Sequence, residues 1–504
     1  MLWTGDDVSR SSVPFFRDVG EYERLRQTLE KAGYTDKGVI EALGAQDSLS
    51  LSSHDLPVLL RRTGEGTPLS ILIRLFLMEV PVDRSVLEKE IQSSVIASWI
   101  DGKLLQGNAN SVAATIRILP FEGFLVAFDR ERRLFSRSGS GFVMGIGGSS
   151  LTLANHTIRK QARSTLDLGS GCGIQAILAS THSERVFAVD RNPRAVRFSE
   201  FNAKLNRLTH LRSRQGDLFE PVQGEKFDLI VSNPPFVISP DMRYIYRDSG
   251  MEGDKICESI VRQAPKLLNN GGFCQVLCNW AEYKGQDWRE RLSEWFDGSG
   301  CDAWVMRSET QETARYASMW IRHTERLQGE NYARRFDEWM AYYDRQGIEA
   351  VSAGFISFRY APDHTNWFRA EDGLGKRKAE CGDAILRGFE LTDYLIAHDD
   401  TALLQTRFRV SPDVRMEQQY VRSDGAWLGS TAKLSLAKGL DYVSEADPPI
   451  VKLISDCDGS RSLEQLFQEM TAPLGADAEK VMSPFIKLVR RFIESGFILP
   501  VEQE

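Results

Sequence analysis

The chain has 504 residues, of which 42% are hydrophobic and 26% charged, and its formal net charge is −8. This composition excludes a disordered or fibrous chain, and the length suffices for roughly three globular domains. The most apolar stretch, residues 71–80, is interrupted by Arg74 and Glu79. It falls short of the roughly 20 apolar residues that span a bilayer, so we expect no membrane segment. The mild acidity argues against nonspecific coating of nucleic acid but leaves room for a local basic patch that guides one RNA.

The amino-terminal sequence and the number of cysteines indicate the cellular compartment in which the protein is expected. No basic segment followed by an apolar core opens the chain, so the sequence predicts a cytoplasmic protein without a signal peptide. Seven cysteines, an odd number, favour reduced thiols over a disulfide framework. Cys274 and Cys278 lie in an apolar, strand-like stretch without partners at zinc-finger spacing. We therefore expect packing thiols and no metal site.

The amino-terminal part is predicted to be helical and to end in a hairpin. The expected elements are helices within 14–45, 68–76, 84–91 and 95–105 and strands at 113–119 and 123–128. Helices followed by a hairpin are typical of a winged-helix arrangement, which serves DNA binding, RNA binding or protein docking. The last helix lacks a run of basic residues, which favours docking or substrate presentation over reading of a duplex.

From residue 165 onward, short apolar runs alternate with helical segments. This pattern predicts a Rossmann-like, doubly wound sheet with helices on both faces, and hence an α/β fold. The expected elements are strands one, two, four and five at 165–168, 185–189, 227–231 and 272–277, with a third strand before residue 216, and crossover helices at 193–205 and 255–268.

We expect three domains. Residues 1–135 form the helical, winged-helix-like domain, and residues 136–398 form the sheet domain, with a helical insertion at about 305–350 and closing strands in 349–360. Residues 399–504 form an α+β domain whose final helix-helix-strand order is compatible with a second winged-helix-like module.

A glycine-rich loop, Asp-Leu-Gly-Ser-Gly-Cys-Gly at 167–173, follows the first expected strand. Glycine lets the backbone turn sharply and approach a ligand at the carboxyl edge of such a sheet. A tight turn needs glycine whether or not a ligand binds, so the loop alone is weak support. Asp190, however, ends the second expected strand, where a carboxylate can accept both hydroxyls of a ribose. The two features together predict a nucleotide-like cofactor.

The glycine spacing differs from the dinucleotide fingerprint, and Asp167 would repel a pyrophosphate. A sulfonium cofactor that carries an ammonium group would instead pair with Asp167. Asp217, after the third strand, is placed to accept an adenine amine, or else it caps a helix or turn. The candidate cofactor-binding residues are Asp167, Gly169, Gly171, Gly173, Asp190, Asp217 and Asn233.

The fourth expected strand ends in Asn233, Pro234, Pro235 and Phe236, our candidate catalytic residues. The prolines fix φ and cannot donate hydrogen bonds, so the loop is stiff and rich in carbonyl acceptors. A conjugated nitrogen is a poor nucleophile because its lone pair is delocalised. Acceptors at its N–H groups, the Asn233 side-chain oxygen and the Pro234 carbonyl, would localise that lone pair for attack on a methyl group. Phe236 would stack on the planar substrate. An ordinary proline-terminated strand is the alternative.

Together these residues resemble the class I S-adenosylmethionine-dependent methyltransferases. Residues 167–173 look like the cofactor loop of that superfamily, Asp190 its ribose acid and 216–217 its adenine loop, and the Asn-Pro-Pro-Phe loop resembles that of its amino-methyltransferases. The resemblance implies S-adenosylmethionine as cofactor. Residues 216–221 followed by the loop are similar to the release-factor glutamine methyltransferases, whereas Phe236 in place of tyrosine is similar to the ribosomal RNA guanine-N2 enzymes.

We expect methyl transfer to a planar conjugated nitrogen of a macromolecule, namely an exocyclic amine of an RNA or DNA base, and the expected partner is an RNA (ribosomal or transfer) or a protein. A protein glutamine N5-methyltransferase and a catalytically inactive cofactor-binding protein are the competing hypotheses. The sequence leaves the oligomeric state open.

Three further segments each have two possible roles. Residues 244–254 either close over the substrate, with Arg247 on a phosphate or carboxylate, or cap a helix through Asp254. Asn279-Trp280 lines the pocket or belongs to the core. Residues 145–153 line the cofactor pocket or form a hairpin or linker.

Overall fold

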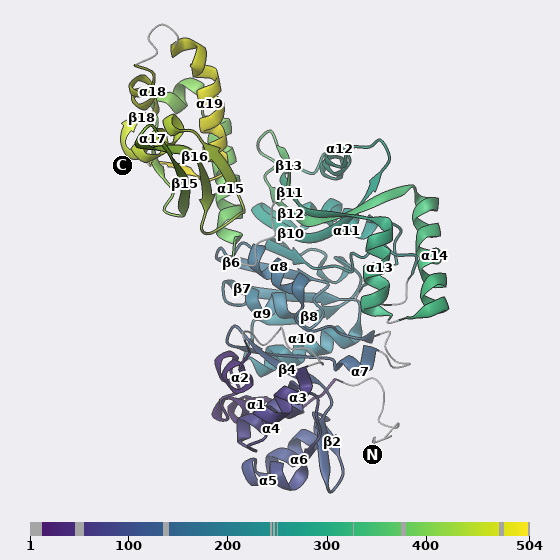
Figure 1. Ribbon diagram of the computed structural model, residues 1–504. Helices are drawn as coiled ribbons and strands as arrows, with labels where there is room; N and C mark the ends of the chain where they lie inside the picture. The colour runs from purple at the N-terminus through teal and green to yellow at the C-terminus, as the bar shows by residue number, and fades with distance from the viewer. Residues whose placement is uncertain are drawn as a thin grey trace. The chain divides into compact units, whose positions relative to one another are not determined.

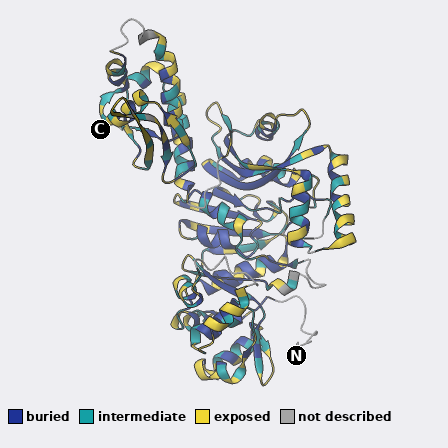
Figure 2. Ribbon diagram, in the orientation of Figure 1, coloured by how far each residue is buried: buried dark blue, intermediate teal, exposed yellow. Residues whose placement is uncertain are grey.

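The central feature of the computed structural model is a mixed eight-stranded sheet with the order β13-β11-β12-β10-β9-β6-β7-β8 (Figure 1). Its strands are β6 (Ala162–Leu168), β7 (Ser183–Asp190), β8 (Leu211–Gln215), β9 (Phe227–Ser232), β10 (Leu268–Tyr283), β11 (Cys301–Glu312), β12 (Ile348–Tyr360) and β13 (Phe368–Asp372). Strands β6 to β10 run parallel, and β12 pairs antiparallel with both β10 and β11. Figure 2 shows most of this sheet as buried, which is typical of parallel strands covered on both faces. The predicted α/β fold is confirmed.

The structure describes residues 13–45, 55–134, 141–241, 244, 247–248, 250–325, 327–373, 380–472 and 478–501. The chain divides into two compact units, one of residues 1–154 and 160–371 and the other of residues 155–159 and 372–504. The three-domain division at residues 135 and 398 stays a prediction. In the described ranges, no helix is both long enough and apolar enough to cross a membrane.

The strand order places a ligand site between β6 and β9. From β6 the chain moves outward to β7 and β8, and it then returns to the other side of β6 with β9 and β10. The crossover helices include α9 (Ile174–Ala179), α10 (Pro193–Leu205) and α11 (Lys255–Gln263), the last followed by the 3-10 turn η4 (Ala264–Leu267). In such sheets ligands bind at the carboxyl ends of the strands where the order reverses.

Two helices, α13 (Thr313–Thr324) and α14 (Gly329–Gln346), follow β11 and precede β12 along the chain. The helical segment begins later than residue 305, because β11 pairs with β12 as far as Glu312. Buried aromatic side chains of these helices, including Tyr316 and Trp339, pack against Val237, just after the predicted catalytic loop. The insertion therefore supports one side of the site.

The amino-terminal elements belong to the same unit. They are α1 (Val19–Lys31), α2 (Asp36–Leu43), α3 (Leu56–Arg62), α4 (Pro68–Phe76), β1 (Val82–Asp83), α5 (Arg84–Glu90), α6 (Ser93–Asp101), β2 (Leu105–Gly107), β3 (Ser111–Ala114), β4 (Arg117–Phe121), β5 (Phe124–Phe128) and α7 (Glu131–Leu134). Strands β1, β3 and β2 form one sheet, and β4 pairs only with β5. The winged-helix interpretation stays a prediction.

The hairpin differs in position from the predicted one. Residues 113–114 belong to β3, which pairs with β2, and the hairpin joins β4 to β5 instead. Glu122 (φ 47°) and Gly123 (φ 77°) form its turn with left-handed backbone at both positions. Two consecutive residues with positive φ are what a two-residue hairpin turn requires, and this sets the pairing of Phe121 with Phe124.

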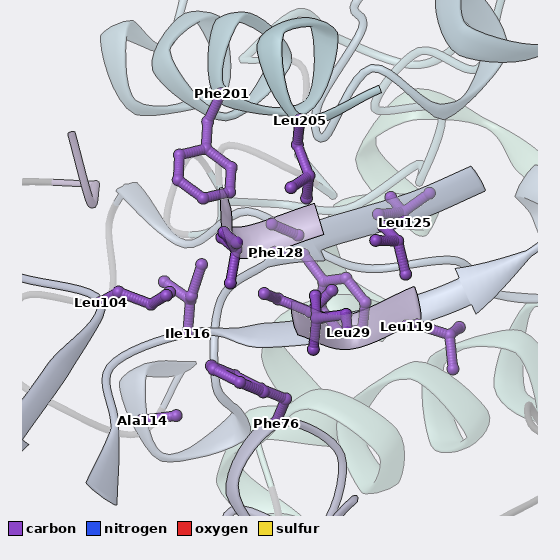
Figure 3. Close-up of a cluster of buried hydrophobic side chains, with 14 of the residues drawn as sticks. Leu29, Phe76, Leu104, Ala114, Ile116, Leu119, Leu125, Phe128, Phe201 and Leu205 are labelled. Atoms are coloured by element: carbon purple, nitrogen blue, oxygen red, sulfur yellow. The ribbon is translucent and has the colours of Figure 1, made fainter. Parts of the chain in front are cut away.

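Two asparagines of α10 hold the outer edge of β5. The Asn202 side chain accepts from Ala127 N (2.7 Å) and donates to Ala127 O (2.9 Å). One turn later, Asn206 accepts from Leu125 N (2.9 Å) and donates to Leu125 O (2.8 Å). Figure 3 shows the apolar cluster around this contact, with Phe201 and Leu205 of α10 above the hairpin. The two side-chain amides provide hydrogen-bond partners for the N–H and C=O groups of β5 that would otherwise be buried and unpaired.

The second unit carries the remaining elements. They are α15 (Gly382–Ala397), α16 (Asp400–Gln405), β14 (Arg407–Val410), β15 (Val414–Ser423), β16 (Ala426–Leu436), β17 (Val443–Ala446), α17 (Pro448–Asp456), β18 (Asp458–Ser462), α18 (Leu463–Thr471), α19 (Ala478–Glu494) and β19 (Ile498–Pro500). They include two three-stranded sheets, β18-β14-β19 and β15-β16-β17. The winged-helix-like description of this part stays a prediction.

Candidate active site

A cavity of about 200 Å³ opens at the carboxyl ends of β6, β7 and β9. Its lining includes the predicted residues Asp167, Gly169, Gly171, Asp190, Asp217, Asn233, Pro234, Pro235 and Phe236. The structure thus brings the predicted cofactor residues and the predicted catalytic loop to one cavity. Gly173 is the exception, since the described lining does not include it.

Gly173 has a packing role. Its φ of 82° is left-handed, and it is the N-cap of α9. A Cβ at this position would lie 2.7 Å from Ser199 Oγ on α10. Glycine therefore lets α9 start directly against α10.

Asp190 lies at the end of β7 beside the glycine loop. Its Oδ2 accepts from Gly171 N (2.8 Å), and its Oδ1 accepts from Asn192 N (2.8 Å). Burial raises the pKa of the Asp190 carboxyl, while the two backbone N–H groups lower it. Each oxygen keeps lone pairs for a further donor. The geometry suits recognition of a diol.

Asp167 is a buried carboxylate on the cavity wall. Its Oδ2 accepts from Ala176 N (2.9 Å). Burial raises the pKa of Asp167 to about 7, and the negative charge of Asp190 adds to the rise. In the part of the chain that the structure describes, no lysine or arginine pairs with Asp167. A cationic ligand group in the cavity would satisfy it.

Asp217 is exposed and lines the same cavity. The neighbouring 3-10 turn η3 (Glu220–Val222) has Phe219 as its N-cap and no side-chain capping bond. Asp217 therefore does not cap that turn. Its carboxylate is available to a ligand.

The predicted catalytic loop follows β9, which Ser232 ties to β6 through a hydrogen bond to Leu168 O (2.8 Å). The Asn233 side chain donates through Nδ2 to Ser149 Oγ (3.2 Å) on α8 (Gly148–His156). This bond turns the amide so that its Oδ1 is left for another partner. Phe236 packs against the insertion and forms a β-bridge with Asp248.

Comparisons with known proteins bear on this cavity. The chain matches the family described as Methyltransferase small domain over residues 145–297. A Methanocaldococcus jannaschii protein named for protein N5-glutamine methyltransferase activity is 32% identical over 136 residues, which cover 25% of this chain and 68% of that protein. The chain is a class I methyltransferase of the small-domain family.

Other relatives are release factor glutamine methyltransferases. The Aliivibrio fischeri enzyme is 41% identical over 152 residues, which cover 28% of this chain and 51% of that enzyme. The Escherichia coli enzyme is 34% identical over 134 residues, which cover 23% of this chain and 47% of that enzyme. This methyltransferase thus spans about half the length of these two relatives. Two families described as domains of unknown function match residues 31–115 and 387–500.

Solved structures resemble the chain more distantly. A tRNA m1G37 methyltransferase of M. jannaschii is 13% identical, with a TM-score of 0.27, over 49% of this chain and 57% of that one. A ribosomal protein L11 methylase of Lactobacillus delbrueckii is 16% identical, with a TM-score of 0.25, over 43% of this chain and 81% of that one.

The methyltransferase family implies S-adenosylmethionine as methyl donor, and the cavity fits that cofactor. S-adenosylmethionine carries an ammonium group, a ribose diol and an adenine amine. The buried carboxylate of Asp167, the two-oxygen acceptor Asp190 and the available Asp217 match these three groups in chemical type.

In segment 244–254, Arg247 is part of the cavity lining, and Asp254 is the N-cap residue of α11. Arg247 is buried, and its guanidinium donates to Asp248 Oδ1 (2.6 Å) and Oδ2 (3.1 Å) and to Thr324 Oγ1 (2.6 Å). The Asp254 carboxylate accepts from Ala281 N (2.9 Å) and from Arg291 (2.6 Å), so α11 is capped by the main-chain carbonyl of Asp254 and not by its side chain. Arg247 therefore fixes the loop to α13 and is not a free anion ligand. Residues 242, 243, 245, 246 and 249 lie outside the described residues.

Trp280 belongs to the core, whereas the segment before β6 belongs to the cavity. Trp280 is fully buried and stacks on Trp288, with ring centroids 5.5 Å apart, so the core interpretation is confirmed. The segment before β6 lines the cavity through Gly145 and Ser149 among others. Sequence reasoning pointed to that segment without identifying Ser149, since nothing local marks a serine as the partner of a distant asparagine.

Proposed function

We propose that this S-adenosylmethionine-dependent methyltransferase moves a methyl group to a planar, conjugated nitrogen held by residues 233–236. One observation carries the proposal. The Asn233 amide nitrogen is engaged by Ser149, so its oxygen is oriented as an acceptor in the cavity that also contains Asp167 and Asp190.

The cofactor end of the cavity is assigned by charge and hydrogen bonding. Asp190 would hold the ribose hydroxyls, Asp217 the adenine amine, and Asp167 the charge of the amino group. Gly169 and Gly171 would let the main chain of the loop approach the cofactor closely, because glycine has no Cβ. Their φ values of 73° and 54° are left-handed and also favour glycine. When bound, S-adenosylmethionine supplies an electrophilic methyl group on a sulfonium.

The acceptor end is assigned to Asn233 and Pro234. Two N–H groups of the substrate would donate to Asn233 Oδ1 and to the Pro234 carbonyl, which favours a tetrahedral nitrogen with a localised lone pair. The positive charge that develops on nitrogen is stabilised by the same two oxygens. As the nitrogen bonds to the methyl carbon, the methyl–sulfur bond would break and S-adenosylhomocysteine would leave, and the methylated nitrogen would then lose one N–H proton to solvent. No strong base is needed, because alignment and fixed dipoles carry the catalysis. Phe236 would cover the plane of the substrate, and Pro235 would keep the loop rigid.

For the substrate we favour a protein glutamine carboxamide over the base amine that the sequence alone placed first. The names of the M. jannaschii, A. fischeri and E. coli relatives support this order, since all three specify glutamine methylation. A carboxamide nitrogen is planar, conjugated and bears two N–H groups, as the acceptor end requires.

Two substitutions test the roles. Asn233→Ala should keep cofactor binding, measured by calorimetric titration, and lose most turnover. Asp190→Ala should weaken cofactor binding. Undiminished methyl transfer by Asn233→Ala would show that the acceptor chemistry is wrong.

A transfer assay tests the substrate. Undermethylated cell extract is incubated with the enzyme and tritiated S-adenosylmethionine and then divided between RNase and protease treatment. Label that survives RNase and is lost to protease is expected. Label that is lost to RNase would restore the base amine as the substrate.

A further inference from the structure

A second cavity, of about 260 Å³, adjoins the first. Ser149, Phe236 and Trp320 line both. Its other walls come from the end of β10, from β11, from α13 and from β12. The last three elements lie beyond residue 297, where the family match ends. These walls of the cavity therefore lie in the part of the chain that the family match does not cover, whereas Asn279 at the end of β10 lies inside it.

Asn279, at the end of β10, presents an acceptor to the second cavity. Its side chain is almost buried, with 5% of the residue exposed. Nδ2 donates to the Tyr316 hydroxyl (2.8 Å), which fixes the orientation of the amide. In the described part of the chain, Oδ1 has no hydrogen-bond partner. Because Asn279 lines this cavity and its Nδ2 is engaged by Tyr316, its Oδ1 is available to accept from a group bound there.

Gln311, on β11, presents a second acceptor. Its Nε2 donates to Glu309 Oε1 (3.0 Å), so Oε1 is directed elsewhere. That oxygen is buried and has no partner among the described residues. The cavity thus combines two unpaired amide oxygens from two different strands.

The remaining polar lining adds acceptors and negative charge. The hydroxyl of Thr152 donates to Gly148 O (2.9 Å), and that of Ser308 donates to Ala353 O (2.8 Å). Their protons are therefore engaged inside the protein. Among the described lining residues, Glu309 is the one charged side chain, and lysine, arginine and histidine do not occur.

We propose that the second cavity binds the part of the substrate next to the methylated nitrogen and selects a group that bears N–H donors and no negative charge. Asn279 Oδ1, Gln311 Oε1 and the Glu309 carboxylate would accept from it, with Phe236 between this group and the methyl donor. The inference rests on the proposed function and deepens it. Amide and ammonium groups of a polypeptide meet these requirements. The phosphates of a nucleotide would face Glu309 without a cation to pair with them.

The test uses the full chain loaded with S-adenosylhomocysteine. Ligand-observed saturation-transfer NMR measures binding of three probes, N-acetylglutamine methylamide, N-acetylglutamine, which has a free carboxylate in place of the methylamide, and guanosine 5′-monophosphate. The methylamide probe should bind at least about tenfold more tightly than the other two, as expected from the loss of a donor and the addition of a negative charge in a site built of acceptors.

Substitutions in the lining of the second cavity test whether this cavity causes the preference among the probes. Gln311→Met keeps the length of the side chain and should weaken binding of the methylamide probe about fivefold, the equivalent of one neutral hydrogen bond. Glu309→Gln should narrow the preference for the methylamide probe over N-acetylglutamine. Glu312→Gln is the matched control, because Glu312 ends the same strand, is exposed and lies outside the described cavity lining, and it should change neither result.

Two outcomes would overturn the inference. One is that N-acetylglutamine or the nucleotide binds as tightly as the methylamide probe. The other is that Gln311→Met and Glu309→Gln both behave like the wild type. Either result leaves methyl transfer and its loss in Asn233→Ala untouched, so failure of this inference is distinguishable from failure of the proposed function.

Discussion

Asn202 connects the amino-terminal hairpin to the cofactor loop, and its replacement by alanine should affect both stability and cofactor binding. The side chain makes three hydrogen bonds, two with the main chain of Ala127 and one to Cys172 O (2.8 Å). All three are lost in Asn202→Ala, and Ala127 N–H is left buried without a partner. At about 1 kcal/mol per bond, the free energy of unfolding should fall by about 3 kcal/mol. Urea denaturation followed by tryptophan fluorescence measures this change.

Cys172 belongs to the cofactor loop, so the bond from Asn202 to Cys172 O ties this loop to α10. Its loss should make the loop less ordered and so weaken cofactor binding. One neutral hydrogen bond corresponds to about a fivefold rise in the dissociation constant of S-adenosylmethionine, measured by calorimetry. Asn206→Ala is the control, because Asn206 lies one turn later and makes the corresponding pair of bonds to Leu125. Its side chain also accepts from Arg26 (2.8 Å) and donates to Asn202 O (2.8 Å), but among the described residues it makes no bond to the loop. It should lower stability and leave cofactor affinity unchanged. Equal effects of the two substitutions on cofactor affinity would refute the reasoning.

Two further predictions concern the site. Because burial raises the pKa of Asp167 to about 7, the native state holds its proton more tightly than the unfolded chain, so this group's contribution to stability falls as pH rises from about 4 to about 7. A cationic ligand favours the ionised form, so calorimetric affinity for S-adenosylmethionine should increase up to about tenfold per pH unit below pH 7 and then level off, and Asp167→Asn should abolish this slope. Ser149→Ala removes the bond from Asn233 and should lower kcat about fivefold, with cofactor affinity unchanged. Ser150→Ala is the control at the neighbouring lining residue and should leave kcat near the wild-type value, since the Ser150 side chain makes no hydrogen bond among the described residues and its main-chain carbonyl accepts from Gln175 (2.8 Å).

The sequence was sufficient for the parts of the site that depend on strand ends. Residues 167–173, Asp190 and Asn233 each follow a parallel strand, and the carboxyl ends of such strands meet at one edge of the sheet. Their order along the chain therefore predicts that they converge, and the cavity contains all but Gly173 of the predicted residues.

The partners that orient these residues were beyond sequence reasoning. Ser149 and Asn233 are 84 residues apart, and Arg247 and Thr324 are 77 residues apart. Neither separation has a periodicity or spacing that a single sequence would reveal. The hairpin shows the same limit at short range, because alternation in 113–119 marks extended chain but does not say which strand it pairs with.

The residues that can be recognised from the sequence and those that cannot have different functions in the proposed mechanism. The kind of nitrogen that can be methylated depends on Asn233 and Pro234, which are adjacent and can be recognised from the sequence. The choice of substrate depends, in our proposal, on Asn279, Gln311 and Glu309, which lie on two strands that are not neighbours in the sheet, since β12 separates β10 from β11. Relatives that match residues 145–297 alone can share Asn233, Pro234 and Asn279 and differ at Glu309 and Gln311, which lie beyond that match. Substrate preference should therefore change with β11 and α13, while the chemistry at Asn233 stays the same.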